Sequence, residues 1–433
     1  MLQTIRNAWK IADLRKKLLF TFAILLLYRL GNVIPVPFVN TTTMTQVFDS
    51  AEIQNSVLGL FNVMSGSALS RATLFALSIQ PYINASIIIQ LLTIAIPALE
   101  RLSKEGGEEG KKKIERITRY TTVGLGLLMG FAYWMMLKNF NVQWDNQLLT
   151  ETGFLPAITV ILSFTAGSAL VMWLGEQITE FGIGNGISMI LFANIVSRLP
   201  QMILTLINGM ITDIGGYWYV ALIAIVGMVA LIMFIVFITN AERRIPVSYA
   251  KRVVGRKVYG GQNTFLPIKV NMSGVLPIIF AQSVATLPAT VATFIGTTNT
   301  WRYKNLWSNT SVFYLVLYLV LIIAFSYFYS TIQYNPVEIS NNLRKNGGFI
   351  PGYRPGRPTS DFIKRVIGKI TLFGAIYLGI VAILPILMGM INTKFAAMAI
   401  GGTSVIIVVG VALETVQAIE AQMLMRHYKG FLE

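Results

Sequence analysis

The chain offers few side chains with the chemistry of a catalytic or metal site. It has no cysteine and a single histidine, His427, so thiolate ligands and histidine clusters are excluded. The stretch GGEEGKKK at 106–113 is partly like a phosphate-binding loop, but Lys112 stands where that motif needs its second glycine. Glu176 and Glu180 lie at predicted helix ends, where solvated carboxylates are ordinary. We therefore expect no catalytic residue, no metal site and no cofactor.

Composition places the chain in a membrane. It is 54% hydrophobic and 12% charged, with a mean hydropathy of +0.63, whereas soluble domains are about 25% charged. The formal net charge of +16 would also suit a nucleic-acid partner, but short basic loops more often reflect membrane topology. A soluble fold is excluded, and topology is the favoured explanation of the basic charge.

Ten apolar segments are long enough to cross a bilayer, because a hydrocarbon core of about 30 Å needs about 20 helical residues. They are 18–36, 73–99, 121–137, 155–174, 186–207, 217–239, 274–295, 312–332, 370–390 and 396–416. Asn185 is predicted to cap the fifth helix, and the GxxxG spacing of Gly126 and Gly130 predicts close packing of the third. The sequence predicts an all-α polytopic membrane protein with ten transmembrane helices.

Basic residues predict the orientation. Of the 35 Lys and Arg residues, 28 lie in five stretches on one side of the apolar segments: 6–17, 101–119, 243–269, 344–369 and 426–429. Arg29 lies inside the first apolar run, where its side chain is expected to extend to the outer interface. Since short basic loops stay cytoplasmic, both termini are predicted to be cytoplasmic.

Three loops are longer than a connection requires. The external loop 37–72 contains the semi-apolar stretch 57–69, which is too short to span and suits either a re-entrant helix or a helix on the outer surface. Loop 240–272 has alternating runs that predict a basic β-hairpin. Loop 333–369 is basic and rich in turn formers. Both cytoplasmic loops are predicted to be docking surfaces.

The chain has a weak internal repeat. Pro81 and Pro277 each fall in the first half of the second predicted helix of a five-helix half, 1–216 or 217–433. A proline inside a helix frees backbone carbonyls and would suit helices that must separate. Because the second half starts from the opposite side, structural repeats would be related by a two-fold axis in the membrane plane. Chance placement of the two prolines is the open alternative.

The predicted spans carry almost no charge. Ion-coupled transporters place ionisable residues within the membrane, which disfavours the main alternative, a secondary transporter with inverted repeats. An intramembrane enzyme would need a nucleophile or an acid/base pair that the spans lack. An uncharged pathway favours a conduit whose cargo is driven by an outside partner.

Five strings, spread in order over both halves, carry a family resemblance. They are LFNVMSGSALSRATLFALSIQPYINASIIIQLLT (60–93), WLGEQITEFGIGNGIS (173–188), ERRIPVSYAKRVVGRKVYGGQNTFLPIKVNMSGVLPIIFA (242–281), NPVEISNNLRKNGGFIPGYRPGRPT (335–359) and GGTSVIIVVGVALE (401–414). Together they resemble the SecY family, the central channel subunits of the bacterial Sec translocon. The resemblance implies two inverted five-helix halves around a central pore. It also implies a protein-conducting channel, not an enzyme, that passes unfolded preproteins outward and releases transmembrane segments sideways into lipid.

The resemblance also assigns residues to the closed pore. An apolar pore ring, which can exclude ions by dewetting and still stretch around a polypeptide, falls on Ile79, Ile83, Ile187, Leu191, Ile279 and Ile407. A plug helix at about 56–71 includes Leu60, Phe61, Asn62, Val63, Met64, Ser65, Gly66, Ser67, Ala68, Leu69 and Arg71. A lateral gate is implied at Asn84, Gln90 and Leu287.

Partners follow from the same resemblance. Docking of the SecA ATPase motor and of the ribosome, including its rRNA, is implied at Arg243, Arg244, Lys251, Arg252, Arg256, Lys257, Arg344, Lys345, Arg354 and Arg357. The small membrane subunits SecE and SecG, signal sequences, nascent preproteins and membrane lipid are the other implied partners. The implied location is the bacterial plasma (inner) membrane.

Overall fold

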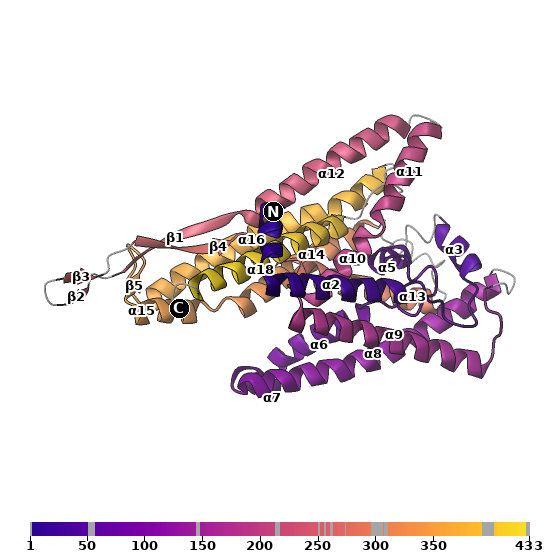
Figure 1. Ribbon diagram of the computed structural model, residues 1–433, viewed down its shortest axis with the longest axis horizontal. Helices are drawn as coiled ribbons and strands as arrows, with labels where there is room; N and C mark the ends of the chain where they lie inside the picture. The colour runs from indigo at the N-terminus through magenta and orange to yellow at the C-terminus, as the bar shows by residue number, and fades with distance from the viewer. Residues whose placement is uncertain are drawn as a thin grey trace. The chain divides into compact units, whose positions relative to one another are not determined.

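The computed structural model is a helical protein with two small sheets (Figure 1). It describes residues 2–50, 57–143, 148–212, 217–249, 252–254, 257–259, 263–272, 274–295, 306, 311–391 and 402–429. The helices are α1 (Leu2–Lys10), α2 (Ala12–Gly31), α3 (Thr41–Asp49), α5 (Val57–Met64), α6 (Gln80–Ala95), α7 (Pro97–Lys104), α8 (Gly107–Gln143), α9 (Phe154–Phe181), α10 (Gly186–Val196), α11 (Leu199–Thr212), α12 (Tyr217–Asn240), α13 (Leu276–Ile295), α14 (Val312–Gln333), α15 (Pro336–Lys345), α16 (Arg357–Ile391) and α18 (Gly402–Lys429).

Every one of the ten predicted apolar segments contains helix. By length and composition, five helices of the described chain can cross a membrane, or six if the bent pair α6 and α7 forms one span. Asn185 caps α10 as predicted, since its Oδ1 accepts hydrogen bonds from the backbone of Ile187 (3.0 Å) and Ser188 (3.3 Å).

The close packing predicted for the third span is confirmed. A Cβ on Gly126 would lie 2.9 Å from Ser168 Oγ, and one on Gly130 would lie 3.1 Å from the carbonyl oxygen of Ile161. Both neighbours belong to α9, so the two glycines let α8 and α9 approach closely. This pair is the framework against which α2, α6 and α10 pack.

Two predicted helices differ from the structure. The second, 73–99, is helical only from Gln80, and the chain then bends by 105° between α6 and α7. The fifth, 186–207, is broken into α10 and α11.

The prediction that Pro81 and Pro277 free backbone carbonyls inside helices is wrong. Pro81 and Pro277 are the second residues of α6 and α13, where a helix has no N–H bond to lose, so neither frees a carbonyl. Pro288 is the proline inside α13. It lacks the N–H that would bond to the carbonyl of Val284 four residues earlier.

The predicted β-hairpin is confirmed with a different pairing. β1 (Glu242–Tyr249) pairs antiparallel with β4 (Asn263–Lys269), and the intervening run folds on itself as β2 (Arg252–Val254) and β3 (Lys257–Tyr259). β5 (Gly348–Phe349), from the other predicted cytoplasmic loop, pairs with the end of β1 and completes a sheet of order β4-β1-β5. An apolar cluster at its base holds Ile245, Val247, Ile268, Met272, Ile350, Ile363 and Ile367.

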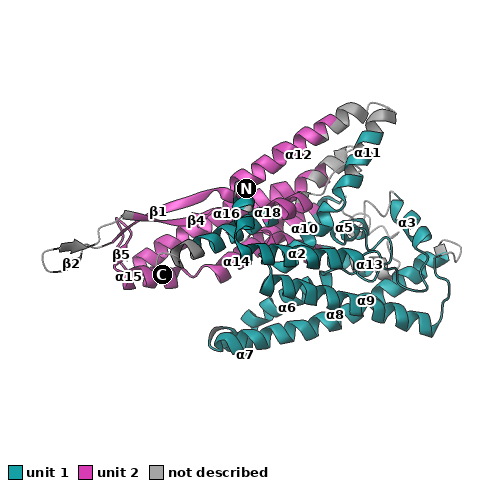
Figure 2. Ribbon diagram, viewed as in Figure 1, with its two compact units in different colours: residues 1–218, 286–314, 411–433 teal, residues 219–285, 315–410 magenta. Residues whose placement is uncertain are grey.

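The chain divides into two compact units (Figure 2). Unit 1 comprises residues 1–218, 286–314 and 411–433, and unit 2 comprises 219–285 and 315–410. Unit 1 contains α1 to α11, and unit 2 contains the sheets together with α15 and α16. The predicted halves 1–216 and 217–433 stay a prediction.

Candidate functional site

The predicted plug begins as a helix and continues as turns. The residues Leu60 to Met64 lie in α5, and those from Ser65 to Arg71 lie in a run of turns that ends at α6. The predicted single helix over 56–71 is therefore wrong in its second part. Gly66 and Ser67 have φ of +67° and +68°, and left-handed backbone ends a helix. We call the described residues 57–79 the plug segment.

The plug segment contains unusual backbone. In the described chain four non-glycine residues have positive φ, and three of them, Ser67, Ala72 and Ser78, belong to this segment. Such conformations cost about 1–3 kcal/mol each and persist only where the surroundings hold them. The contacts of this segment must therefore supply that stabilisation.

Part of this stabilisation comes from within the segment. Asn62 is buried, and its Oδ1 accepts a hydrogen bond from the backbone of Ser70 at 3.0 Å. The carbonyl of Asn62 accepts another from the backbone of Ser67 at 2.9 Å. Ser65 Oγ accepts from the backbone of Leu69 at 3.2 Å. These bonds tie the turns back onto the last turn of α5.

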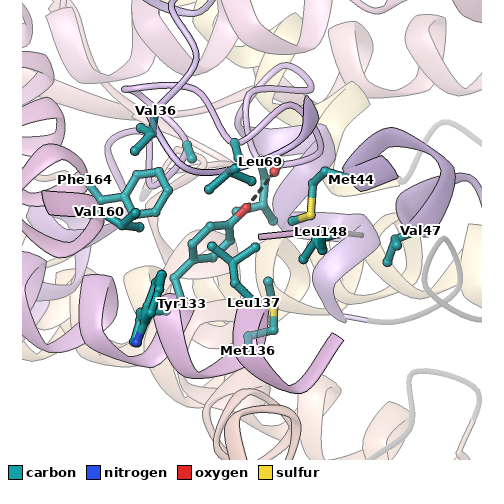
Figure 3. Packing of buried hydrophobic residues seen from close by; sticks show 14 of the residues in the cluster. Val36, Met44, Val47, Leu69, Tyr133, Met136, Leu137, Leu148, Val160 and Phe164 are labelled. Atoms are coloured by element: carbon teal, nitrogen blue, oxygen red, sulfur yellow. Dashed lines mark hydrogen bonds between the residues drawn. The ribbon is translucent and has the colours of Figure 1, made fainter. Parts of the chain in front are cut away.

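An apolar cluster in unit 1 packs around Leu69 of the plug segment (Figure 3). Tyr133 on α8 donates its hydroxyl to the carbonyl oxygen of Leu69 at 2.8 Å, and its ring packs edge-on against Phe164 of α9 with centroids 4.7 Å apart. The cluster includes Val36, Met44, Val47, Leu69, Tyr133, Met136, Leu137, Leu148, Val160 and Phe164. It fastens the plug segment to α3, α8 and α9.

Polar contacts from α10, α2 and α6 hold Met64 and Ser78 of the plug segment. Asn194 on α10 is fully buried, and its Nδ2 donates to the carbonyl oxygen of Met64 at 2.9 Å and to Ser78 Oγ at 3.2 Å. Tyr28 on α2 places its hydroxyl 3.3 Å from the same Ser78 Oγ. Gln80 Nε2 donates to Met64 Sδ at 3.4 Å. Met64 and Ser78 of the segment are thereby linked to α10.

The end of the Arg29 side chain lies beside the plug segment, and its extension to the outer interface stays a prediction. Its Nη1 is buried and would lie 3.0 Å from a Cβ on Gly66, as would Asn194 Oδ1. The plug segment therefore passes Arg29 of α2 and Asn194 of α10 at Gly66. Because glycine has no side chain, both polar groups have room there.

The residues predicted to form the pore ring are mostly buried. Ile79 directly precedes α6, Ile83 lies in its first turns, and Ile187 and Leu191 lie on α10. Of these four in unit 1, only Ile187 is partly exposed. A Cβ on Gly175 of α9 would lie 3.5 Å from Ile79 Cδ1 and 3.8 Å from Ile187 Cγ1, so these two side chains share one neighbour.

The other two predicted ring residues belong to unit 2. Ile279 on α13 and Ile407 on α18 are 6% and 1% exposed. Val275 Cγ2 would lie 2.6 Å from a Cβ on Gly410, so the residue just before α13 packs closely on α18. The assembly of all six residues into one ring stays a prediction.

The predicted gate residues lie on α6 and α13. Asn84 and Gln90 are half-buried on α6, and Gln90 Oε1 is a buried atom with no hydrogen-bond partner in the described chain. Leu287 is 53% exposed and precedes Pro288. Their apposition across one seam stays a prediction.

Most of the predicted docking residues that the structure describes lie on β1, at the end of α15 or at the start of α16. Arg243 and Arg244 are exposed on β1, opposite Ile268 and Pro267 of β4. Arg344 and Lys345 end α15, Arg354 lies in a turn, and Arg357 begins α16; all four are exposed. Arg252 and Lys257 begin β2 and β3, while Lys251 and Arg256 lie outside the described residues.

Three contacts of the plug segment were missed from the sequence: those of Tyr133, Asn194 and Arg29. Tyr133 and Asn194 are isolated polar groups in apolar helices, a common pattern that identifies no contact. Arg29 did carry a signal, since a charge inside an apolar run calls for a partner.

The comparisons with known proteins agree on one family. The SecY family model matches residues 73–416. A protein translocase subunit SecY from Streptomyces scabiei is 42% identical over 443 aligned residues and covers 100% of both chains. One from Corynebacterium glutamicum is 41% identical over 449 aligned residues with the same coverage.

Solved structures show the same fold. A structure described as that of a protein conducting channel matches with a TM-score of 0.67 and 18% identity, covering 94% of this chain and 92% of that one. Sec61 in the canine ribosome-channel complex matches with a TM-score of 0.63 and 16% identity, covering 94% and 92%. The ten-helix layout predicted from the sequence is consistent with this fold.

Proposed function

The chain belongs to the SecY family of protein translocase subunits, and from this membership we propose that it forms the conduit through which unfolded preproteins cross the membrane. As a channel subunit it is not an enzyme. The observation that carries the proposal is the plug segment, which the rest of unit 1 holds by hydrogen bonds to the carbonyl oxygens of Leu69 and Met64. The segment is held by specific contacts and also contains residues in unfavourable backbone conformations. This combination suits a plug that must leave the pore and return to it.

In the proposed resting state, the plug and the apolar ring close the pore together. A related solved structure is described as showing that the plug domain of SecY stabilises the closed state and maintains a membrane seal. The ring has no charge to hold water, so it stays closed to ions and still widens around a chain. Transmembrane segments leave sideways between the α6 and α13 sides of a gate that includes Asn84, Gln90 and Leu287.

The chain has no energy source of its own, so it needs partners. Two solved relatives, canine Sec61 and yeast Ssh1, are ribosome complexes. For this chain we propose that the ribosome and the SecA motor dock on the basic sheet and its flanks, and that SecE and SecG complete the complex in the membrane.

We also propose a bacterial plasma membrane location with both termini in the cytoplasm. The curated relatives named above are bacterial. Within unit 1, Thr4 Oγ1 donates to Glu420 Oε1 at 3.1 Å, which supports placing α1 and the end of α18 on one side. The inverted relation of the halves 1–216 and 217–433 is proposed with it.

Reconstitution tests the function directly. The full chain would be placed in proteoliposomes with SecE and SecG, and protease protection of a preprotein would be measured with SecA and ATP. We expect import that requires this chain and ATP. Import of equal extent from proteoliposomes without the chain would contradict the proposal, and a preprotein with a defective signal sequence is the matched control.

A further inference from the structure

Two polar groups from different helices converge on one glycine of the plug segment. Arg29 Nη1 of α2 and Asn194 Oδ1 of α10 each lie 3.0 Å from where a Cβ on Gly66 would be, so their separation is at most twice that distance. Asn194 Cα lies 3.3 Å from the same point. Any side chain at residue 66 would therefore push both groups away.

These two groups are complementary in chemistry. Both atoms are buried, and neither makes a hydrogen bond with any described residue. A guanidinium N–H only donates and an amide oxygen only accepts. A buried polar group without a partner costs about 1–3 kcal/mol. One direct bond, or one bridging water, would remove the cost for both.

We propose that Arg29 and Asn194 form a latch across Gly66 that holds the plug segment in its closed position. A small rotation of either side chain, or one bridging water, lets Arg29 Nη1 donate to Asn194 Oδ1, while Asn194 Nδ2 donates to the carbonyl oxygen of Met64. The amide of Asn194 thus links the cation on α2 to the backbone of the plug segment. The inference rests on the proposed role of residues 57–79 as a plug, and it assigns Arg29 and Asn194 as positioning residues.

The test follows the accessibility of a thiol in the plug segment. Ala68 is 1% exposed, and the chain has no cysteine, so Ala68→Cys supplies the only thiol. Its labelling by a membrane-impermeant reagent would be timed in proteoliposomes with SecE and SecG. Arg29→Met and Asn194→Leu should each raise the resting labelling rate about tenfold or more, as expected for a lost charge-assisted hydrogen bond.

The double variant is the decisive measurement. If the two groups act on each other, Arg29→Met with Asn194→Leu should label no faster than the faster single variant. Rates that multiply would overturn the latch and leave two independent packing effects. If Arg29→Met does not fold, Arg29→Lys replaces it. The latch is supported if Arg29→Lys raises the labelling rate partially in the parent and adds no further increase in the Asn194→Leu background. A rate equal to that of the parent contradicts the latch.

A glycine pair supplies a matched control. Gly66→Ala should raise labelling in the parent but add little in the double variant, because its Cβ acts by displacing the same two groups. Gly107 has a similar left-handed backbone (φ +56°) and nothing within 4 Å of its Cβ position, so Gly107→Ala should label like the parent. Equal effects of the two substitutions would contradict the latch.

The same assay separates failure of the latch from failure of the proposed function. In the parent, a translocating preprotein should increase labelling at residue 68. Import without such an increase means that residues 57–79 are not a plug, and the latch falls with that assignment. An increase in the parent without coupling between Arg29 and Asn194 overturns the latch alone.

Discussion

Tyr249, the last residue of β1, lies directly opposite Gly348 of β5 in an antiparallel pair. The two residues are 99 positions apart in the sequence and come from different predicted cytoplasmic loops. Their pairing makes the predicted docking surfaces parts of one sheet. Gly348 permits it, because a Cβ there would lie 3.0 Å from Tyr249 Cε1 and 3.4 Å from the carbonyl oxygen of Leu343.

We expect Gly348→Val to separate β5 from β1, because the branched side chain has no room beside the Tyr249 ring. The readout is disulfide formation between cysteines placed at the paired positions Ser248 and Phe349, which should fall about tenfold. Gly368→Val is the control, since a Cβ at Gly368 meets nothing within 4 Å. Unchanged crosslinking in Gly348→Val would show that the contact does not determine the pairing.

Membrane orientation is tested with single thiols. Cysteines at Gly255 and Asn346 should react only with reagent on the cytoplasmic side, and one at Asn299 only from outside, because 28 of the 35 Lys and Arg residues lie on one predicted side. Labelling would be measured in sealed cells and in inverted vesicles. External labelling of Gly255→Cys in sealed cells would reverse the orientation.

Polar substitution of the predicted ring should loosen the closed pore. Ile407 is 1% exposed, and Ile407→Asn would bury an unpaired amide at a cost of about 1–3 kcal/mol. We expect greater ion conductance in planar bilayers and passage of preproteins with defective signal sequences. Ile407→Leu keeps the apolar bulk and is the silent control. Unchanged conductance across Asn substitutions at several ring positions would mean that these residues only pack.

Arg354→Glu should lower SecA-dependent export about tenfold, equivalent to about 1.4 kcal/mol of lost binding, with less effect on ribosome-coupled insertion. Arg354 is exposed in a turn beside α16, where a charge is available to an acidic partner. Export and insertion would be measured in the same vesicles. Full rescue by Arg354→Lys together with disturbed topology in Arg354→Glu would assign the residue to topology instead.

Cysteines at Asn84 and Leu287 should crosslink in the resting channel and block both export and membrane insertion. A short rigid crosslinker should block almost completely, whereas a long flexible one should permit passage. Failure to crosslink would place the seam elsewhere. Efficient crosslinking with undiminished translocation would contradict the gate more strongly, since this seam would then not need to open.

Apolar length predicted the helical fold well, because it is a local property of the sequence. The orientation drawn from basic charge stays a prediction. Every predicted span contains helix, and the cap at Asn185 and the close packing at Gly126 and Gly130 follow from motifs a few residues long. The end of α5 at Met64 was not predictable in the same way. The segment that follows is apolar enough for a helix, and its turns depend on contacts with Asn194 and Tyr133, which are distant in sequence.

The strand pairing could not be predicted, because it joins residues that are far apart in the sequence. The alternating runs of loop 240–272 indicated strands, but the register of β1 with β4 and the addition of β5 join residues that no local pattern connects. The prolines show the same limit: the predicted helices begin several residues earlier than α6 and slightly earlier than α13, which places Pro81 and Pro277 in their interiors, whereas the proline inside α13 is Pro288.

The chain passes between its two units inside helices and not in loops. Unit 2 gives way to unit 1 between Ala285 and Thr286, within α13 and beside Pro288, and again after Gly410, within α18. Proline removes a backbone hydrogen bond and glycine adds conformational freedom, so two of the four boundaries, those in α13 and α18, lie next to residues at which a helix bends easily. A change in the curvature of α13 or α18 would therefore fall most readily at Pro288 or Gly410.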